Sequence, residues 1–168
     1  MSVTLPTMPN YTDGELRNMA TVNAFFEGGR EFDRISIWAD DATWWNGLPM
    51  LPSNPGQTEH KGRDAIAGIL GGSGRPHPGT GIDSYDLATN RFSDVVVLAD
   101  GDWVMRQHTQ HSTTLGGQPY RNVYCFVFRF NSEGKVVYLT EHWNTWHAER
   151  VLFNNFEVEP AHPLEDPA

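Results

Sequence analysis

The chain has 168 residues, with 12 Lys and Arg against 21 Asp and Glu, and a formal net charge of -9. This length suits one domain with a hydrophobic core. The acidic balance argues against binding to nucleic acid or to an anionic membrane, because both require clustered positive charge, and a small molecule is the expected partner. The single cysteine, Cys125, excludes an intrachain disulfide.

The protein is predicted to be soluble and cytoplasmic. Residues 1–10 lack a basic stretch followed by an apolar run, and no window approaches the roughly 18 apolar residues of a membrane span. The aromatic residues stand out, with 6 Trp, 9 Phe and 5 Tyr. Such rings fill a core or line a pocket for a flat apolar ligand.

A helix is predicted over about residues 13–28. Thr12 and, three residues later, Glu15 form a capping box, and apolar residues then recur at helical spacing. The glycine pair at 28–29 ends this helix. The spacing of apolar residues over 32–38 predicts a second, short helix.

The middle of the chain alternates between elements and loops. Residues 42–46 are predicted to form a strand rich in bulky side chains, and the proline- and glycine-rich stretch 47–56 a loop. A third helix is expected from 62–66 to the glycine pair at 71–72, followed by another loop at 73–81.

Four long strands are predicted in the second half, at about 83–98, 102–114, 120–131 and 135–147. The turn-forming stretches 99–101, 115–118 and 131–134 join them into antiparallel hairpins. We expect one domain over residues 1–158 and a loose, proline-containing tail over 159–168.

Four short motifs in this order resemble those of the NTF2-like superfamily, which includes ketosteroid isomerases, SnoaL-like cyclases and scytalone dehydratases. They are Ala-Asp-Asp-Ala-Thr at 39–43, Gly-Arg-Asp-Ala-Ile at 62–66, Gly-Gln-Pro at 117–119 and Arg-Phe-Asn-Ser-Glu-Gly-Lys-Val at 129–136. The resemblance covers about residues 12–147. It implies an α+β cone in which three N-terminal helices pack on a strongly curved antiparallel β-sheet.

The same resemblance argues against steroid double-bond isomerisation. That reaction requires a carboxylate base and an oxyanion hole of a tyrosine and a protonated aspartate. The base position corresponds to Asn46, the two tyrosine positions to Val22 and about Leu70, and the acid position to Phe126. None of these side chains can perform the role.

The side chains expected inside the cone follow from the resemblance and from strand alternation. We expect Glu141 and His111 to act as the acid–base pair, with Tyr124 and Asn46 as further catalytic candidates. Gln107 and Thr109 share the face of His111, and a one-residue slip would bring Arg106, His108 and Gln110 inward instead. The substrate-binding walls are predicted to be Phe25, Phe26, Trp44, Gln107, Asn122, Phe126, Phe128 and Trp143.

The predicted function is a cofactor-independent lyase that dehydrates or deformylates a hydrophobic aromatic molecule, such as a lignin-derived diarylpropane diol. A carboxyl group and an imidazole in an apolar cavity titrate nearer neutral pH, which suits proton transfer. A SnoaL-like isomerase or cyclase acting on a polyketide- or steroid-type ring, and a domain that only binds a small molecule, are the alternatives.

No metal and no cofactor are expected. His108 and His111 are three residues apart on a predicted strand and point to opposite faces, and no phosphate-binding glycine loop follows a strand. An epoxide hydrolase of this fold would need carboxylates bridged by an arginine. Arg106 has the right spacing, but the residue two positions later is His108 and not an acid, so this activity is not expected. Apolar residues predicted on the outer face, Val123, Cys125 and Val127, indicate a homodimer or a higher homo-oligomer.

Overall fold

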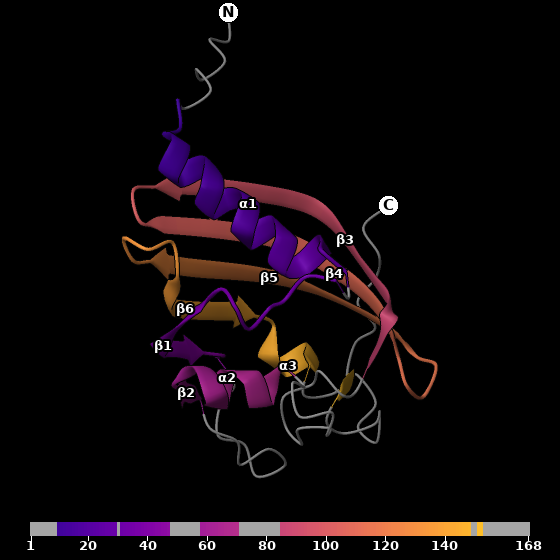
Figure 1. The fold of residues 1–168 in the computed structure, drawn as a ribbon. Coiled ribbons are helices and arrows are strands. Elements are labelled where there is room, and N and C mark those ends of the chain that lie inside the picture. The colour runs from indigo at the N-terminus through magenta and orange to yellow at the C-terminus, as the bar shows by residue number, and fades with distance from the viewer. Residues whose placement is uncertain (1–9, 30, 48–57, 71–84, 149–150, 153–168) are drawn as a thin grey trace, which may run out of the picture.

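The computed structural model describes residues 10–29, 31–47, 58–70, 85–148 and 151–152. Within these residues a six-stranded sheet is accompanied by one long helix, α1 (Asp13–Glu27), and two short ones, α2 (Arg63–Ile69) and α3 (Thr145–Ala148) (Figure 1). The predicted α+β class is confirmed.

Helix α1 begins at the predicted capping box. The Thr12 hydroxyl accepts a hydrogen bond from the Glu15 backbone nitrogen (3.2 Å), and the Glu15 carboxylate accepts one from the Thr12 nitrogen (2.7 Å). The other Glu15 oxygen accepts from the backbone nitrogen of Gly101 (2.9 Å), in the turn between β3 (Tyr85–Asp100) and β4 (Trp103–Thr114). One carboxylate therefore both caps the helix and holds it to the sheet.

The sheet has the strand order β2-β1-β6-β5-β4-β3. Its remaining strands are β1 (Trp38–Trp45), β2 (Glu59–Lys61), β5 (Pro119–Phe130) and β6 (Val136–Trp143). β1 runs parallel to β6, and the other neighbouring strands are antiparallel. The sheet is therefore mixed, whereas an antiparallel sheet was predicted.

The curled sheet surrounds the core from one side and α1 lies across its inner face (Figure 1). α1 packs against β3 and β4, and α2 against β1. Fully buried apolar side chains from these elements form the core, including Val22, Trp38, Val104, Phe128 and Leu139. We call the face that carries these sheet residues the inner face.

The predicted second helix at 32–38 is wrong. Residues 31–37 form bends and turns, and β1 begins at Trp38. The Asp33 carboxylate accepts hydrogen bonds from the backbone nitrogens of Ile35 (2.9 Å) and Ser36 (3.1 Å). An aspartate that binds backbone groups in this way stabilises a turn in competition with a helix.

Two short elements were not predicted, β2 and α3, and α3 replaces the end of the strand expected over 135–147. No helix in the described part of the chain is long and apolar enough to cross a membrane. The predicted tail at 159–168 lies outside the described residues.

Candidate active site

The inner face of the two strands β5 and β6 carries the predicted residues. Phe126 pairs with Glu141, Tyr124 with Trp143, and Phe128 with Leu139, so each pair shares a face. Asn122, Tyr124, Phe126 and Phe128 are all buried. The predicted orientation of these residues, including Glu141, is confirmed.

The predicted orientation of β4 is wrong by one residue. Phe126 pairs with Arg106, Tyr124 with His108 and Asn122 with Gln110. These three β4 partners are therefore on the inner face, and all are buried.

The turn between β4 and β5 explains this correction. A four-residue connection over 115–118 would have paired Phe126 with Gln107. Instead Thr114 donates from its nitrogen to Gln118 (2.7 Å), which leaves a three-residue loop, and Gly117 adopts a φ of 85° that glycine tolerates. Because side chains alternate along a strand, one residue in the loop exchanges the two faces.

His111 and Gln107 consequently lie away from the inner face. His111 Nε2 is hydrogen-bonded to the Ser93 hydroxyl (2.9 Å), and Gln107 is exposed. Thr109, predicted to point inward, donates to the Asp94 carboxylate (3.1 Å) beside a bulge in β3. The structure therefore contradicts a direct pairing of His111 with Glu141.

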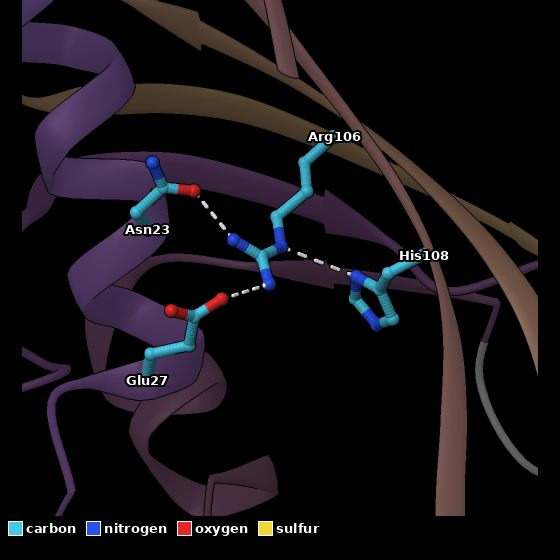
Figure 2. A network of polar contacts seen from close by, with 4 residues as sticks. All are labelled: Asn23, Glu27, Arg106 and His108. Atoms are coloured by element: carbon cyan, nitrogen blue, oxygen red, sulfur yellow. Dashed lines mark hydrogen bonds and ion pairs between the residues drawn. The ribbon is translucent and has the colours of Figure 1, made fainter. Parts of the chain in front are cut away.

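Arg106, itself fully buried, is the centre of a polar network that reaches the half-exposed Glu27 on α1 (Figure 2). Its side chain is 0% exposed, and its guanidinium binds the Glu27 carboxylate and the Asn23 amide oxygen of α1, each at 2.5 Å. Its Nε donates to His108 Nδ1 (3.2 Å). The rings of Phe26 and Phe92 lie beside the guanidinium carbon at 4.9 and 5.7 Å. The network satisfies the cation that the sheet buries.

His108 extends this network into an aromatic cluster. The residue is 1% exposed, and its ring contacts those of Phe26, Phe92 and Phe126 at centroid distances of 4.9, 4.7 and 5.6 Å. Burial, together with the positive charge of Arg106, lowers the pKa of His108 to about 3. The imidazole is therefore neutral at physiological pH.

Glu141 has the opposite shift. Its carboxylate oxygen accepts a hydrogen bond from Trp44 Nε1 (3.2 Å). Burial raises the pKa of Glu141 to about 8, although the Trp44 hydrogen bond acts in the other direction. The side chain is therefore mostly a neutral carboxylic acid at pH 7.

The other two catalytic candidates lie on either side of Glu141. Asn46 directly follows β1, and its amide nitrogen donates to His60 Nε2 on β2 (3.0 Å). The Tyr124 hydroxyl is hydrogen-bonded to the Tyr120 hydroxyl (2.7 Å). Both Asn46 and Tyr124 are buried.

The remaining wall residues form a cluster of aromatic rings, some stacked and some in edge-on or tilted contact. Tyr124 stacks on Trp143 with centroids 5.4 Å apart, and Trp44 stacks on Trp38 at 6.0 Å. From α1, Phe25 contacts Phe128 and Phe26 contacts Phe126. All the predicted wall residues except Gln107 therefore belong to the core or the inner face.

Several polar residues of this region were not predicted or were predicted to point outward, among them Asn23, Glu27, His60, Arg106, His108 and Gln110. Asn23 and Glu27 are four residues apart and therefore share one side of α1, which is a signal that sequence offers. Nothing in the sequence connected that pair to Arg106. Among the described residues, no group of three His, Cys, Asp or Glu side chains could hold a metal ion.

Comparison with known proteins identifies the fold family. A family model described as a SnoaL-like domain matches residues 19–139. Among curated proteins, none matches the chain.

Solved structures of the same fold share little sequence with the chain. An NTF2-like protein of unknown function from Burkholderia pseudomallei K96243 has a TM-score of 0.63 and 20% identity over 81% of this chain and 97% of that protein. A phenazine biosynthesis-related protein from Pseudomonas aeruginosa has a TM-score of 0.64 and 15% identity over 97% and 96% of the two chains. TerC, co-crystallised with polyporic acid, has a TM-score of 0.61 and 18% identity over 82% and 98%.

At these identities the solved structures establish the fold alone. The family model, in contrast, extends from the middle of α1 to β6 and so includes most of the chain. The chain belongs to the SnoaL-like domain family of the NTF2-like fold, a family that includes isomerases and cyclases.

Proposed function

We propose that the protein is a lyase that acts on an aromatic small molecule by proton transfer through Glu141. The observation that carries this proposal is the carboxyl group of Glu141, a half-buried residue beside Trp44 and Phe126, whose pKa is raised by desolvation to about 8. An acid with a pKa near the working pH both donates and accepts protons efficiently.

The chemistry begins with Glu141 as the acid. The protonated carboxyl gives its proton to a benzylic hydroxyl, and the carbon–oxygen bond breaks with its electron pair on the departing water. A phenolic ring that loses its own proton to solvent water then becomes a quinone methide, and its oxygen takes a proton back from solvent when the aromatic ring is restored. The reaction leaves Glu141 as a carboxylate, ready to act as a base.

In the second half Glu141 recovers its proton from the substrate. Removal from a neighbouring carbon completes a dehydration. Removal from a neighbouring primary alcohol releases formaldehyde, because the carbon–carbon bond breaks and its electron pair restores the aromatic ring. The phenolic ring accepts the electrons in both cases.

The aromatic walls support this class of substrate. Tyr124 and Trp143 stack on each other on the inner face, and Phe26 and Phe126 contact one another across it. Flat rings of this kind suit a flat apolar ligand. NTF2-like domains bind small hydrophobic ligands, and TerC, which has this fold, was co-crystallised with polyporic acid.

Asn46 and Tyr124 are the remaining catalytic candidates of the proposal. Each is buried, and each carries a hydrogen-bonding group on the side of the fold that holds Glu141. We assign them to orienting the substrate oxygen atoms, because neither group exchanges a proton readily at neutral pH.

An isomerase or cyclase is the second candidate, because the same carboxyl can move a proton between two carbons of one ring. Family membership favours this alternative, since the family includes isomerases and cyclases. Product analysis separates the two. A lyase releases water or formaldehyde, whereas an isomerase or cyclase gives a product of unchanged mass.

The test uses phenolic diarylpropane diols, with formaldehyde release and ultraviolet spectra as the measurements. Glu141→Gln keeps the shape of the side chain and removes its proton, so turnover should fall by about a hundredfold or more. His111→Ala, on the other side of the sheet, should leave turnover unchanged. A Glu141→Gln variant that is folded and turns over at the parent rate would refute the proposal. Binding without any turnover by the parent protein would indicate a binding domain.

We also propose that a second copy of the chain covers the outer face of the sheet. Val96, Leu98 and Val123 are exposed there at 44%, 49% and 53%, and exposed apolar faces of this kind are typical of interfaces. Val123→Asp should shift a dimer to a monomer in sedimentation equilibrium. A monomeric parent at micromolar concentration would contradict this prediction.

A further inference from the structure

The tautomer of His108 follows from its contact with Arg106. A guanidinium is always protonated and offers hydrogens alone, so His108 Nδ1 must accept the hydrogen bond from Arg106 Nε. The neutral ring therefore carries its proton on Nε2. A second proton on Nδ1 would place two N–H groups against each other beside a positive charge.

Among the residues that the structure describes, none offers an acceptor to the His108 Nε2–H group. In Figure 2 this nitrogen lies on the far side of the ring from Arg106, and no interaction reaches it. A buried donor without an acceptor costs on the order of 1–3 kcal/mol. The aromatic faces of Phe26 and Phe92 nearby are weak replacements for an oxygen. An unsatisfied donor of this kind in a native structure requires an explanation, and an acceptor supplied by a bound ligand is one.

We propose that His108 donates a hydrogen bond from Nε2–H to a negatively charged or carbonyl oxygen of an aromatic ligand bound against the inner face. The fixed cation of Arg106 lies directly behind the ring, and so favours an acceptor that carries negative charge. The surrounding rings exclude water, which strengthens the bond.

The inference deepens the proposed function and rests on it for the nature of the ligand. His108 and Glu141 lie on either side of β5, two strand spacings and two residue positions apart, so their Cα atoms are about 12 Å apart. They therefore contact different parts of one ligand. The phenolic oxygen of the proposed substrate, which becomes the quinone methide carbonyl, fits the His108 end.

Asn23 and Glu27 are positioning residues in this arrangement. Their oxygen atoms hold the two terminal nitrogens of Arg106, so that Nε remains directed at His108. Glu27 also supplies the counter-charge that a buried guanidinium requires. The pair therefore fixes the donor without contacting the ligand.

A binding experiment compares 4-nitrophenolate with nitrobenzene, which has the ring without the phenolic oxygen. The parent should bind the phenolate at least tenfold more tightly, since hydrogen bonds to charged acceptors are among the stronger ones. His108→Phe should lose this preference and still bind nitrobenzene. His108→Gln, which retains a donor, should keep part of the preference, and His111→Phe should keep all of it. Equal preference in the His108→Phe and parent proteins would overturn the inference.

The tautomer is measured on the parent protein, which removes any dependence on whether variants fold. Long-range ¹H–¹⁵N spectra should show His108 as the neutral Nε2–H form at pH 7, and an Nδ1–H or doubly protonated ring would contradict the inference. Glu141→Gln separates this inference from the proposed function. That variant should retain the phenolate preference while losing turnover, and each of the two results can fail without the other.

Discussion

Arg106 and Glu141 are two ionisable side chains that the inner face of the sheet shields from water, and they differ in their charge state. Arg106 remains charged because Glu27 supplies a counter-charge and Asn23 and His108 complete its hydrogen bonds. Glu141 has a hydrogen bond from Trp44 and is buried beside aromatic rings, so it holds its proton. A buried charge persists where its partners are built into the fold, and otherwise the group becomes neutral.

The two sites also respond to pH in opposite directions. Glu141 titrates higher in the folded protein than in the unfolded chain, so its contribution to stability is complete below pH 4.5 and declines as pH rises toward 8. His108 titrates lower when folded, so its contribution is present above pH 6.5 and declines as pH falls toward 3. Substitutions at the two positions should therefore act on opposite limbs of the stability profile.

The largest expected effect is at Glu141. Glu141→Gln replaces a group that resists ionisation with one that never ionises, so the variant should lose the fall in stability between pH 4.5 and 8. The difference amounts to about 4 kcal/mol in the free energy of unfolding at the alkaline end. Urea unfolding of both proteins at pH 5 and pH 8.5 measures it. Parallel profiles would show that Glu141 ionises normally.

Glu27→Gln tests the ion pair between Glu27 and Arg106. The substitution leaves the guanidinium of Arg106 buried without its counter-charge, and should reduce the free energy of unfolding by about 3 kcal/mol. Glu59→Gln is the matched control, because the Glu59–Lys61 pair is exposed and such pairs contribute less than about 1 kcal/mol. If the two variants lose equal stability, Glu27 does not serve as the essential counter-charge.

Of the three substitutions, His108→Gln should have the smallest effect on the free energy of unfolding over the pH range that can be measured. The parent should lose about 2 kcal/mol of stability from this residue between pH 6.5 and 5, since protons bind the unfolded chain first. The variant should lack that loss. His111→Gln, a half-buried histidine on the other side of the sheet, serves as the control. An unchanged acid limb in His108→Gln would contradict the neutral, buried imidazole.

Sequence patterns predicted correctly those elements whose stability comes from contacts between residues close together in the chain. The Thr12–Glu15 capping box placed the start of α1, because both partners lie within one helical turn. The short helix expected at 32–38 failed for the same kind of reason, since Asp33 stabilises a turn that apolar spacing does not reveal. The parallel pairing of β1 with β6 joins residues about a hundred positions apart, and no local pattern specifies it.

Which side chains belong to the candidate site depended on the register of the strands more than on the kinds of residue present. Glu141, Tyr124 and Phe126 were placed correctly, because β5 and β6 alternate as expected. A loop shorter by one residue, made possible by Gly117, brought Arg106 and His108 inward and His111 outward. Arg106 then contacts Asn23 and Glu27 on α1, about 80 positions away in the chain, and no local pattern predicts these contacts.

The most direct test of the account is the titration of the Glu141 carboxyl. Carbon-13 labelling of glutamate side chains, with Glu141→Gln to assign the resonance, gives its pKa in the folded protein without any substrate. We predict a midpoint near 8, as burial requires. A midpoint near the ordinary value of 4.5 would show a carboxylate at neutral pH, and would contradict the role of Glu141 as the acid that begins the reaction.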